Sequence, residues 1–199
     1  MGKFCLVTGG LGFIGHHLVN LLLARGDRVR ILDLATPTQR IAGVEYITGS
    51  ITDQPTVQQA IQGIDWVFHL AANAGLWSPR KDEFVTINQT GTRNVMTAAI
   101  AANVEKVVHC STESILKSVR RSPHSAHSTT DESVTLTLDD MAGAYCRGKF
   151  VAEQEAFAAA EQGLPVVIVN PTVPIGPGDR RITPPTRMML GFLNGTYPA

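Results

Sequence analysis

The chain has 199 residues, which is long enough to bury a full hydrophobic core, and one large domain is the expected count. Its composition, with 44% hydrophobic and 17% charged residues, is that of a soluble globular protein. The 17 basic residues equal the 17 acidic ones, so no net charge favours nucleic acid or an anionic membrane as a partner. Three cysteines cannot form a closed disulfide framework, and no apolar run has the length of a membrane span, so we expect a cytoplasmic protein.

The first element is a short apolar run, residues 3–7, which predicts a buried strand. The glycine-rich sequence TGGLGFIG follows at Thr8–Gly15, and apolar residues at helical spacing then run to Gly26, which fits a C-cap. Strand, glycine turn and helix are the context of a dinucleotide fingerprint, because the glycines let backbone approach a pyrophosphate and the helix N-terminus offers free N–H groups. One such match is weak evidence, and a glycine-rich turn without a ligand is the alternative.

Residues 28–32 predict a second strand, and Asp33 stands at its carboxyl end. The dinucleotide fold places an acid there to accept hydrogen bonds from the hydroxyls of the adenosine ribose. A carboxylate repels a 2′-phosphate, and no Arg follows directly, so NAD is favoured over NADP as the cofactor. A surface Asp that opens the next loop is the alternative, and Arg40 is the residue that could still support NADP.

Residues 44–48 alternate like a third strand, and Asp53 after them fits the N-cap of a helix over residues 55–62. Residues 65–70 predict a fourth strand that opens into small residues, against which a flat ligand can lie. His69 at the end of this strand is a candidate ligand or base, although a packed core histidine is the more frequent case.

A long helix is expected over residues 81–103. Gly91 falls inside it and indicates a close backbone contact, because a glycine in a helix interior costs about 1 kcal/mol relative to alanine. Residues 106–110 predict a fifth strand, and Thr112 follows it at the edge where such sheets bind ligands.

Residues 117–133 are rich in Ser, Thr and His and predict a loop. His124 and His127 lie three residues apart there, but no Cys or acid stands at ligand spacing, so we predict no metal site. A helix is expected over residues 139–161 and a sixth strand over residues 166–169.

Prolines break the pattern after Asn170, and only residues 187–193 look helical there. Six strands that alternate with helices predict an α/β fold with a doubly wound parallel sheet, the Rossmann fold. We therefore expect a dinucleotide-binding domain over residues 1–170 and the beginning of an incomplete substrate-binding region over residues 171–199.

Tyr145 and Lys149 stand four residues apart on the predicted helix and hence on one face. A nearby cation stabilises phenolate and lowers the pKa of a tyrosine from about 10 towards the working range. The phenol can then exchange a proton with a substrate oxygen, which the hydroxyl of Thr112 could orient. An ordinary exposed pair on a helix is the alternative, and for the pair alone that alternative would be preferred.

Taken together, these features resemble the extended short-chain dehydrogenase/reductase family, in its NAD-dependent epimerase/dehydratase branch. The resemblance is closest to dihydroflavonol-reductase-like members, especially the hopanoid-associated sugar epimerases. It covers the whole chain, and the motifs that carry it are Thr8–Gly15 (TGGLGFIG), His69–Ala72 (HLAA), Asn88–Asn94 (NQTGTRN), Ser111-Thr112, Tyr145–Lys149 and Asn170–Asp179 (NPTVPIGPGD).

The resemblance implies a role for each matching residue. Thr112 would orient the substrate, Tyr145 would be the catalytic acid and base, and Lys149 would bind the nicotinamide ribose. The remaining cofactor-binding residues would be Gly9, Gly12, Phe13, Ile14 and Gly15 at the pyrophosphate, Asp33 at the adenosine ribose, Ser50 and Ile51 at the adenine, Leu70, Ala71 and Ala72 along the cofactor, and Pro171 and Val173 near the nicotinamide.

Three departures from the family pattern stand out. Ser50 replaces the usual Asp and is a weaker partner for the adenine amino group, whereas Gly148 replaces the usual Ser before Lys149, a change expected to be harmless. Family members also generally run about a hundred residues further. We therefore expect either a truncated form or an unusually open substrate pocket.

The predicted function is an NAD-dependent oxidoreductase, epimerase or dehydratase that acts on a secondary alcohol or ketone of a small molecule, with a nucleotide sugar as one candidate. A non-catalytic NAD-binding protein of the same family is the alternative. The resemblance also implies a homodimer in which the helices over residues 81–103 and 139–161 pair across a two-fold axis. Small residues for such contacts are Ala98, Ala99, Ala102, Ala156, Ala158 and Ala159, although internal packing could use them equally well.

Overall fold

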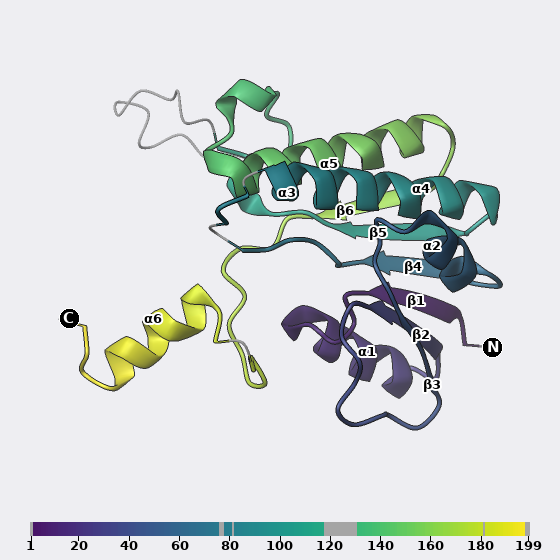
Figure 1. The fold of residues 1–199 in the computed structure, drawn as a ribbon, viewed down its shortest axis with the longest axis horizontal. Coiled ribbons are helices and arrows are strands. Elements are labelled where there is room, and N and C mark those ends of the chain that lie inside the picture. Colours follow the sequence, from purple (N-terminus) through teal and green to yellow (C-terminus); the bar gives the residue numbers. More distant parts are fainter. Residues whose placement is uncertain (1, 76–77, 81, 118–130, 181, 198–199) are drawn as a thin grey trace.

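The computed structural model describes residues 2–75, 78–80, 82–117, 131–180 and 182–197. Its centre is a six-stranded sheet with the strand order β3-β2-β1-β4-β5-β6 (Figure 1). Each pairing between neighbouring strands is parallel. The strands are β1 (Phe4–Thr8), β2 (Arg28–Asp33), β3 (Val44–Thr48), β4 (Trp66–His69), β5 (Lys106–Cys110) and β6 (Val166–Val169).

This order confirms the predicted doubly wound sheet. The chain proceeds outward from β1 to β3, returns to β4 beside β1, and then proceeds outward in the other direction. Because all strands are parallel, their carboxyl ends meet at one edge, which faces left in Figure 1. The order reverses between β1 and β4, and ligands of such folds bind in the crevice at that point.

Helices cover both faces of the sheet (Figure 1). The main core cluster includes Leu6 and Val67 and packs under α2 (Gln54–Ile61), α4 (Gly91–Ala101) and α5 (Gly143–Glu161). A second cluster joins Val7 to Val19 of α1 (Phe13–Ala24) on the opposite face. Strands that are buried on both sides are nearly continuous apolar runs, and β1 is accordingly buried at all five positions.

The long helix predicted over residues 81–103 is not regular. Lys81 lies outside the described residues, and the helical chain runs through α3 (Asp82–Val85), a π-helical turn η1 (Thr86–Thr90) and α4. The prediction for Gly91 was wrong in one respect: a Cβ there would collide with the side chain of Ile51, not with backbone.

The helix predicted over residues 139–161 is also interrupted. A 3-10 turn, η4 (Leu138–Asp140), comes first, the backbone is extended at Met141 and Ala142, and α5 begins at Gly143. Gly143 has a φ of +65°, which glycine adopts without strain. The break buries Met141 in a small cluster with Ile115 of the 3-10 turn η2 (Glu113–Ile115), and local periodicity does not reveal that contact.

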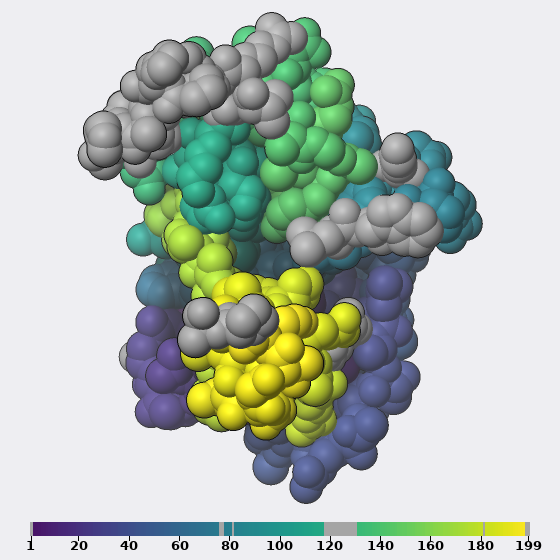
Figure 2. Space-filling view, turned by 90° about the vertical axis from the view of Figure 1, so that its left-hand side faces the viewer, coloured from purple at the N-terminus to yellow at the C-terminus, as the bar shows by residue number. Residues whose placement is uncertain are grey.

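The last segment leaves the sheet after β6 and ends in α6 (Pro184–Leu193), which begins three residues earlier than predicted. On the way it lies against α1: His17 Nε2 is 2.8 Å from the carbonyl oxygen of Pro177, and Gly176 lies beside the ring of Phe13. Figure 2 shows this yellow segment in front of the lower half of the carboxyl edge. Within the described part of the chain, no helix is long and apolar enough to cross a membrane.

Candidate functional site

The glycine-rich turn lies between the carboxyl end of β1 and the N-terminus of α1. Gly9 has a φ of +70°, and a Cβ there would lie 2.9 Å from the backbone nitrogen of Ala71. A Cβ on Gly15 would lie 2.7 Å from the Cα of Gly10. Both positions therefore require glycine, because a side chain would push the turn apart.

This turn leaves backbone N–H groups free at the start of a helix. Gly12 is the N-cap of α1 and offers no side-chain cap, so the N–H groups of Phe13 and Ile14 have no acceptor within the helix. Unpaired N–H groups and the positive end of the helix dipole form a site for an anionic group. The cradle fits the pyrophosphate of a dinucleotide.

Asp33 ends β2 beside this turn. Its Oδ2 accepts a hydrogen bond of 3.0 Å from the backbone N–H of Leu11, and its Oδ1 accepts one of 3.0 Å from Ala35. Each carboxylate oxygen can accept a second hydrogen bond, so the group can still receive ribose hydroxyls. Arg40 lies elsewhere, with its guanidinium 5.4 Å from the ring centre of Tyr46.

Ser50 and Ile51, the residues proposed to contact the adenine, differ in their hydrogen bonds and surroundings. Ser50 Oγ is engaged with Thr52 Oγ1 at 2.7 Å. Ile51 is buried, with its side chain against Gly91 and its carbonyl oxygen 3.0 Å from Asn94 Nδ2. A role for Ile51 at the adenine stays a prediction and would have to use its backbone.

His69 is a packed core histidine, the more frequent of the two alternatives considered from the sequence. Its ring is 1% exposed and bonds to two threonines, Thr8 and Thr92. The following residues, Leu70 to Ala72, form the facing side of the crevice, because the turn at Gly9 packs against Ala71.

Thr112, Tyr145 and Lys149 meet at the carboxyl end of β5. Thr112 is 7% exposed; its hydroxyl donates to Ser114 Oγ and accepts from the Ser114 N–H, each at 3.3 Å, and it lies close enough to the Tyr145 phenol to lower its pKa in part. Lys149 is 4% exposed, and its ammonium group donates a 2.7 Å hydrogen bond to the carbonyl oxygen of Cys110. Helix α5 therefore presents both residues to the strand end, and the alternative of an exposed surface pair is excluded.

The structure corrects the expected effect of Lys149 on the pKa of Tyr145. Burial raises the pKa of Tyr145 above its ordinary value, and the nearby side chain of Thr112 opposes this only in part. Lys149 does not lower the pKa of Tyr145 in this structure, since its ammonium is directed at the Cys110 carbonyl. Burial lowers the pKa of Lys149 itself.

Gly148 is required by packing, which the sequence did not reveal. A Cβ at this position would lie 2.6 Å from the carbonyl oxygen of Phe84 in α3. Glycine lets the backbones of α3 and α5 approach each other closely at this point. A serine at position 148 would carry that Cβ, so it would need a wider spacing between α3 and α5. At the spacing seen here, glycine in place of serine is the residue that fits.

Two asparagines support the site and were missed as functional residues. Asn170 Nδ2 donates to the carbonyl oxygen of Thr112 at 3.2 Å and to Glu153 at 3.3 Å. Asn88 accepts a 2.7 Å hydrogen bond from the backbone N–H of Asn73, which steadies the loop after β4. Both asparagines lie in motifs that carry the family resemblance, so the sequence already contained a signal for them.

Pro171 and Val173 follow Asn170 directly. The carbonyl oxygen of Pro171 accepts a hydrogen bond of 3.4 Å from the backbone N–H of Glu113, which keeps this segment beside the end of β5. Val173 is half exposed and has a φ of +40°, unusual for a β-branched residue. Their assignment to the nicotinamide stays a prediction.

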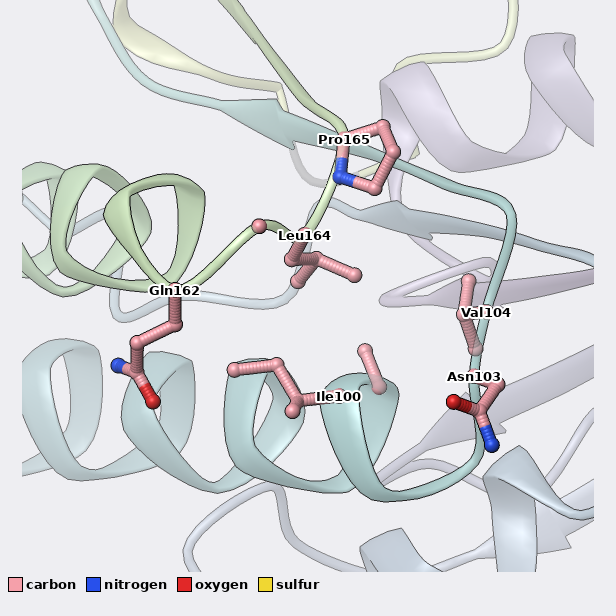
Figure 3. A pocket seen from close by; sticks show the side chains of 8 residues that line it. Ile100, Asn103, Val104, Gln162, Leu164 and Pro165 are labelled. Carbon is pink, nitrogen blue, oxygen red and sulfur yellow. The ribbon is translucent and has the colours of Figure 1, made fainter.

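Among the described residues, no group of three or more His, Cys, Asp or Glu side chains gathers as metal ligands. His124 and His127 lie outside those residues. A hollow of about 300 Å³ is present at the opposite end of the sheet, where the chain leaves α4 and α5 (Figure 3). It is lined by Ile100, Val104 and Leu164 among others, and it has no part in the site at the carboxyl edge.

A glycine cradle, an acid at the end of β2, and a half-buried tyrosine with a buried lysine at the end of β5 define an α/β protein of the dinucleotide-binding class. The comparison with known proteins names the family. Residues 5–196 match the model of the NAD dependent epimerase/dehydratase family, and the chain belongs to that family.

Three relatives illustrate the similarity. The chain is 37% identical over 202 residues to a protein of Synechocystis sp. that carries the name of dihydroflavonol 4-reductase, over 100% of this chain and 57% of that protein. It is 34% identical to the 2-alkyl-3-oxoalkanoate reductase of Stenotrophomonas maltophilia, over 90% of this chain and 53% of the reductase. Among solved structures, the Thermus thermophilus UDP-glucose 4-epimerase in complex with NAD has a TM-score of 0.80 and 28% identity, over 94% of this chain and 60% of the epimerase.

These relatives are reductases and epimerases of the extended short-chain dehydrogenase/reductase type, so the predicted family is confirmed. The chain spans little more than half the length of the curated relatives. The activity of the whole protein is accordingly a proposal.

Proposed function

We propose that this chain binds NAD along the carboxyl edge of its sheet and acts as an NAD-dependent oxidoreductase, epimerase or dehydratase on a secondary alcohol or ketone. The observation that carries the proposal is the half-buried Tyr145 near buried Thr112 and Lys149, at the same edge as the glycine cradle. A nucleotide sugar is one candidate substrate, because the Thermus relative is a UDP-glucose 4-epimerase.

NAD, when bound, would supply the hydride acceptor or donor. Tyr145 exchanges a proton with the substrate oxygen, and Thr112, whose side chain lies near the phenol, orients that oxygen. Lys149 stays buried and would hold the nicotinamide ribose, with the Cys110 carbonyl fixing its ammonium group. The backbone of Phe13 and Ile14 would hold the pyrophosphate.

The alternative of a non-catalytic NAD-binding protein gains no support from the site, since Thr112, Tyr145 and Lys149 are all present at the end of β5, with Thr112 and Lys149 buried. Calorimetry with NAD, followed by turnover assays with sugar nucleotides and hydroxy-ketones, tests the proposal. Binding with cofactor-dependent turnover is the expected result. Binding without turnover on any substrate class would favour the alternative, and absent NAD binding would overturn the proposal.

Cofactor choice is expected to depend on Asp33. NAD should bind more tightly than NADP, because the carboxylate at the end of β2 opposes a 2′-phosphate. Asp33→Ser should reduce the ratio of NAD affinity to NADP affinity by about tenfold, which is the effect of one modest electrostatic interaction. Dissociation constants for both cofactors, measured by calorimetry, check this result.

Arg40→Ala is the matched control for this prediction, and it should leave the preference unchanged because the guanidinium lies over Tyr46. Equal affinity of the unchanged chain for both cofactors would contradict the assignment of Asp33. A loss of NADP binding in Arg40→Ala would then identify Arg40 as the phosphate partner.

Residues 171–199 are proposed to begin the substrate-binding region, with the main dinucleotide-binding unit ending at residue 170. The segment passes from the end of β6 to α1 and thus crosses the edge at which the cofactor is proposed to lie. Location in the cytoplasm and membership of the hopanoid-associated subgroup are also proposals.

A homodimer through α4 and α5 is the proposed assembly. Four of the six alanines predicted for it are buried inside the core, namely Ala98, Ala99, Ala156 and Ala159, so they serve internal packing. The outer surface of the helix pair still offers Ala158 and the 47% exposed ring of Phe157. A shallow hollow of about 250 Å³ lies between the two helices beside Ala158.

Light scattering at micromolar concentration should give the mass of a dimer, and Ala158→Arg should give a monomer because a charged side chain would enter the contact. Leu21→Arg is the control, since Leu21 is 69% exposed on α1 at the other face of the sheet. A monomeric mass for the unchanged chain, or dissociation by Leu21→Arg alone, would refute this interface.

A further inference from the structure

Two buried histidines lie side by side in the sheet, and in the described part of the chain only one of them is hydrogen-bonded. His69 and His109 occupy paired positions on β4 and β5, with ring centres 5.3 Å apart, and each is 1% exposed. His69 Nδ1 is 2.8 Å from Thr8 Oγ1, and His69 Nε2 is 3.0 Å from Thr92 Oγ1. Neither ring nitrogen of His109 has a partner among the described residues.

The contacts of Thr8 determine which nitrogen of His69 carries the proton. Thr8 Oγ1 accepts a hydrogen bond of 3.2 Å from the backbone N–H of Ala71. At 3.2 Å it also shares the N–H of Leu70 with the Thr8 carbonyl oxygen, which lies 3.2 Å from the same nitrogen. A hydroxyl has two lone pairs and one hydrogen, so two N–H donors occupy the lone pairs and the hydrogen must go to Nδ1. His69 Nδ1 is therefore an acceptor, the ring proton is on Nε2, and Nε2 donates to Thr92.

The same hydroxyl connects the two sides of the proposed NAD crevice. Thr8 is the last residue of β1 and directly precedes Gly9, while Leu70 and Ala71 form the facing segment after β4. If Nδ1 carried the proton, the Thr8 oxygen would face three donors with two lone pairs. The bond from Ala71 or the shared contact with Leu70 would then be lost, and Leu70 would keep only its bond to the Thr8 carbonyl oxygen.

We infer that His69 is a positioning residue, whose neutral Nε2–H tautomer orients the Thr8 hydroxyl and so holds the glycine turn against the segment after β4. This inference rests on the proposed function for the role of that crevice. The surroundings keep the ring neutral, because burial and, to a smaller extent, the charge of Lys149 lower the pKa of His69 to about 3.

The tautomer is tested on the NAD-free chain by nitrogen NMR with ¹⁵N-labelled histidine. The expected spectrum shows an Nε2 that carries an exchange-protected hydrogen and an Nδ1 with the shift of an unprotonated imidazole nitrogen. A protonated Nδ1 would overturn the inference. This readout needs no variant and no cofactor.

His69→Leu and His109→Leu form a matched pair, because each removes one buried imidazole but only the first removes hydrogen bonds. His69→Leu should accelerate hydrogen exchange at the amide of Ala71 and weaken NAD binding by about tenfold, as expected for one lost buried hydrogen bond. The amide of Leu70 should change less, because it also donates to the Thr8 carbonyl oxygen. His109→Leu should leave both quantities within about twofold. Equal effects of the two variants would overturn the inference.

His69→Gln provides the conservative comparison, since its side chain also carries one acceptor and one donor. It should recover part of the amide protection that His69→Leu loses, and no recovery would count against an orienting role. If the unchanged chain fails to bind NAD, the proposed function falls. The NMR tautomer and the amide exchange then still decide the positioning role.

Discussion

Tyr145→Phe is expected to reduce turnover by about 10²- to 10⁴-fold, the range of general acid–base catalysis, while the affinity for NAD stays nearly unchanged. The substitution keeps the ring, which packs in the small cluster around Met141, and removes only the hydroxyl. Steady-state kinetics on the substrate found in the turnover assays, together with calorimetry for NAD, measure the two quantities separately.

Two companion variants distinguish the roles within the acid–base centre. Thr112→Val should reduce turnover only, because it removes the hydroxyl assigned to orient the substrate and keeps the shape of the side chain. Lys149→Met should reduce both turnover and NAD affinity, since Lys149 is assigned to the ribose as well. Full turnover in Tyr145→Phe would refute the mechanism even if the fold and the cofactor assignments stand.

Gly15→Ala is expected to weaken NAD binding by at least about tenfold, because overpacking of this kind costs about 1–3 kcal/mol. The added Cβ would lie 2.7 Å from the Cα of Gly10 and would collide with the carbonyl of Gly9. Backbone atoms cannot rotate away as a side chain can, so the turn itself must move and the free N–H groups of α1 move with it. Calorimetry with NAD and thermal unfolding measure the change.

Gly176→Ala is the control for this second prediction. It adds the same methyl group at the carboxyl edge, but its Cβ would make only an ordinary contact, 3.4 Å from the ring of Phe13. NAD affinity should be retained in this variant. If Gly15→Ala bound NAD as tightly as the control, the glycine turn would not be the pyrophosphate site.

Local pattern was sufficient for the strands and for most of the site residues. The boundaries of β3, β5 and β6 agree with those expected from apolar runs, and Asp53 caps α2 through a bond to the backbone N–H of Thr56. Such features depend on residues close together in the chain. Pattern failed at the π-helical turn and at Met141, because both adjust the backbone to neighbours far away in the sequence.

The same contrast between local sequence pattern and long-range packing applies to the site residues. Asp33, Tyr145 and Lys149 could be named from motif and spacing, whereas the partner of Lys149 is the carbonyl of Cys110, 39 residues away. A backbone carbonyl has no signature in the sequence. The pKa of Tyr145 was therefore predicted in the wrong direction, since burial outweighs the assumed neighbouring charge.

The sequence by itself determined the order of strands and helices, the family, the glycine turn and the acid–base pair, because each depends on residue type at short spacing. Only the tertiary structure decided that Gly148 must be glycine against Phe84, that four alanines belong to the core, and that His69 but not His109 finds hydrogen-bond partners among the described residues. These facts arise where distant segments pack together, and each depends on distances between atoms that no local pattern encodes.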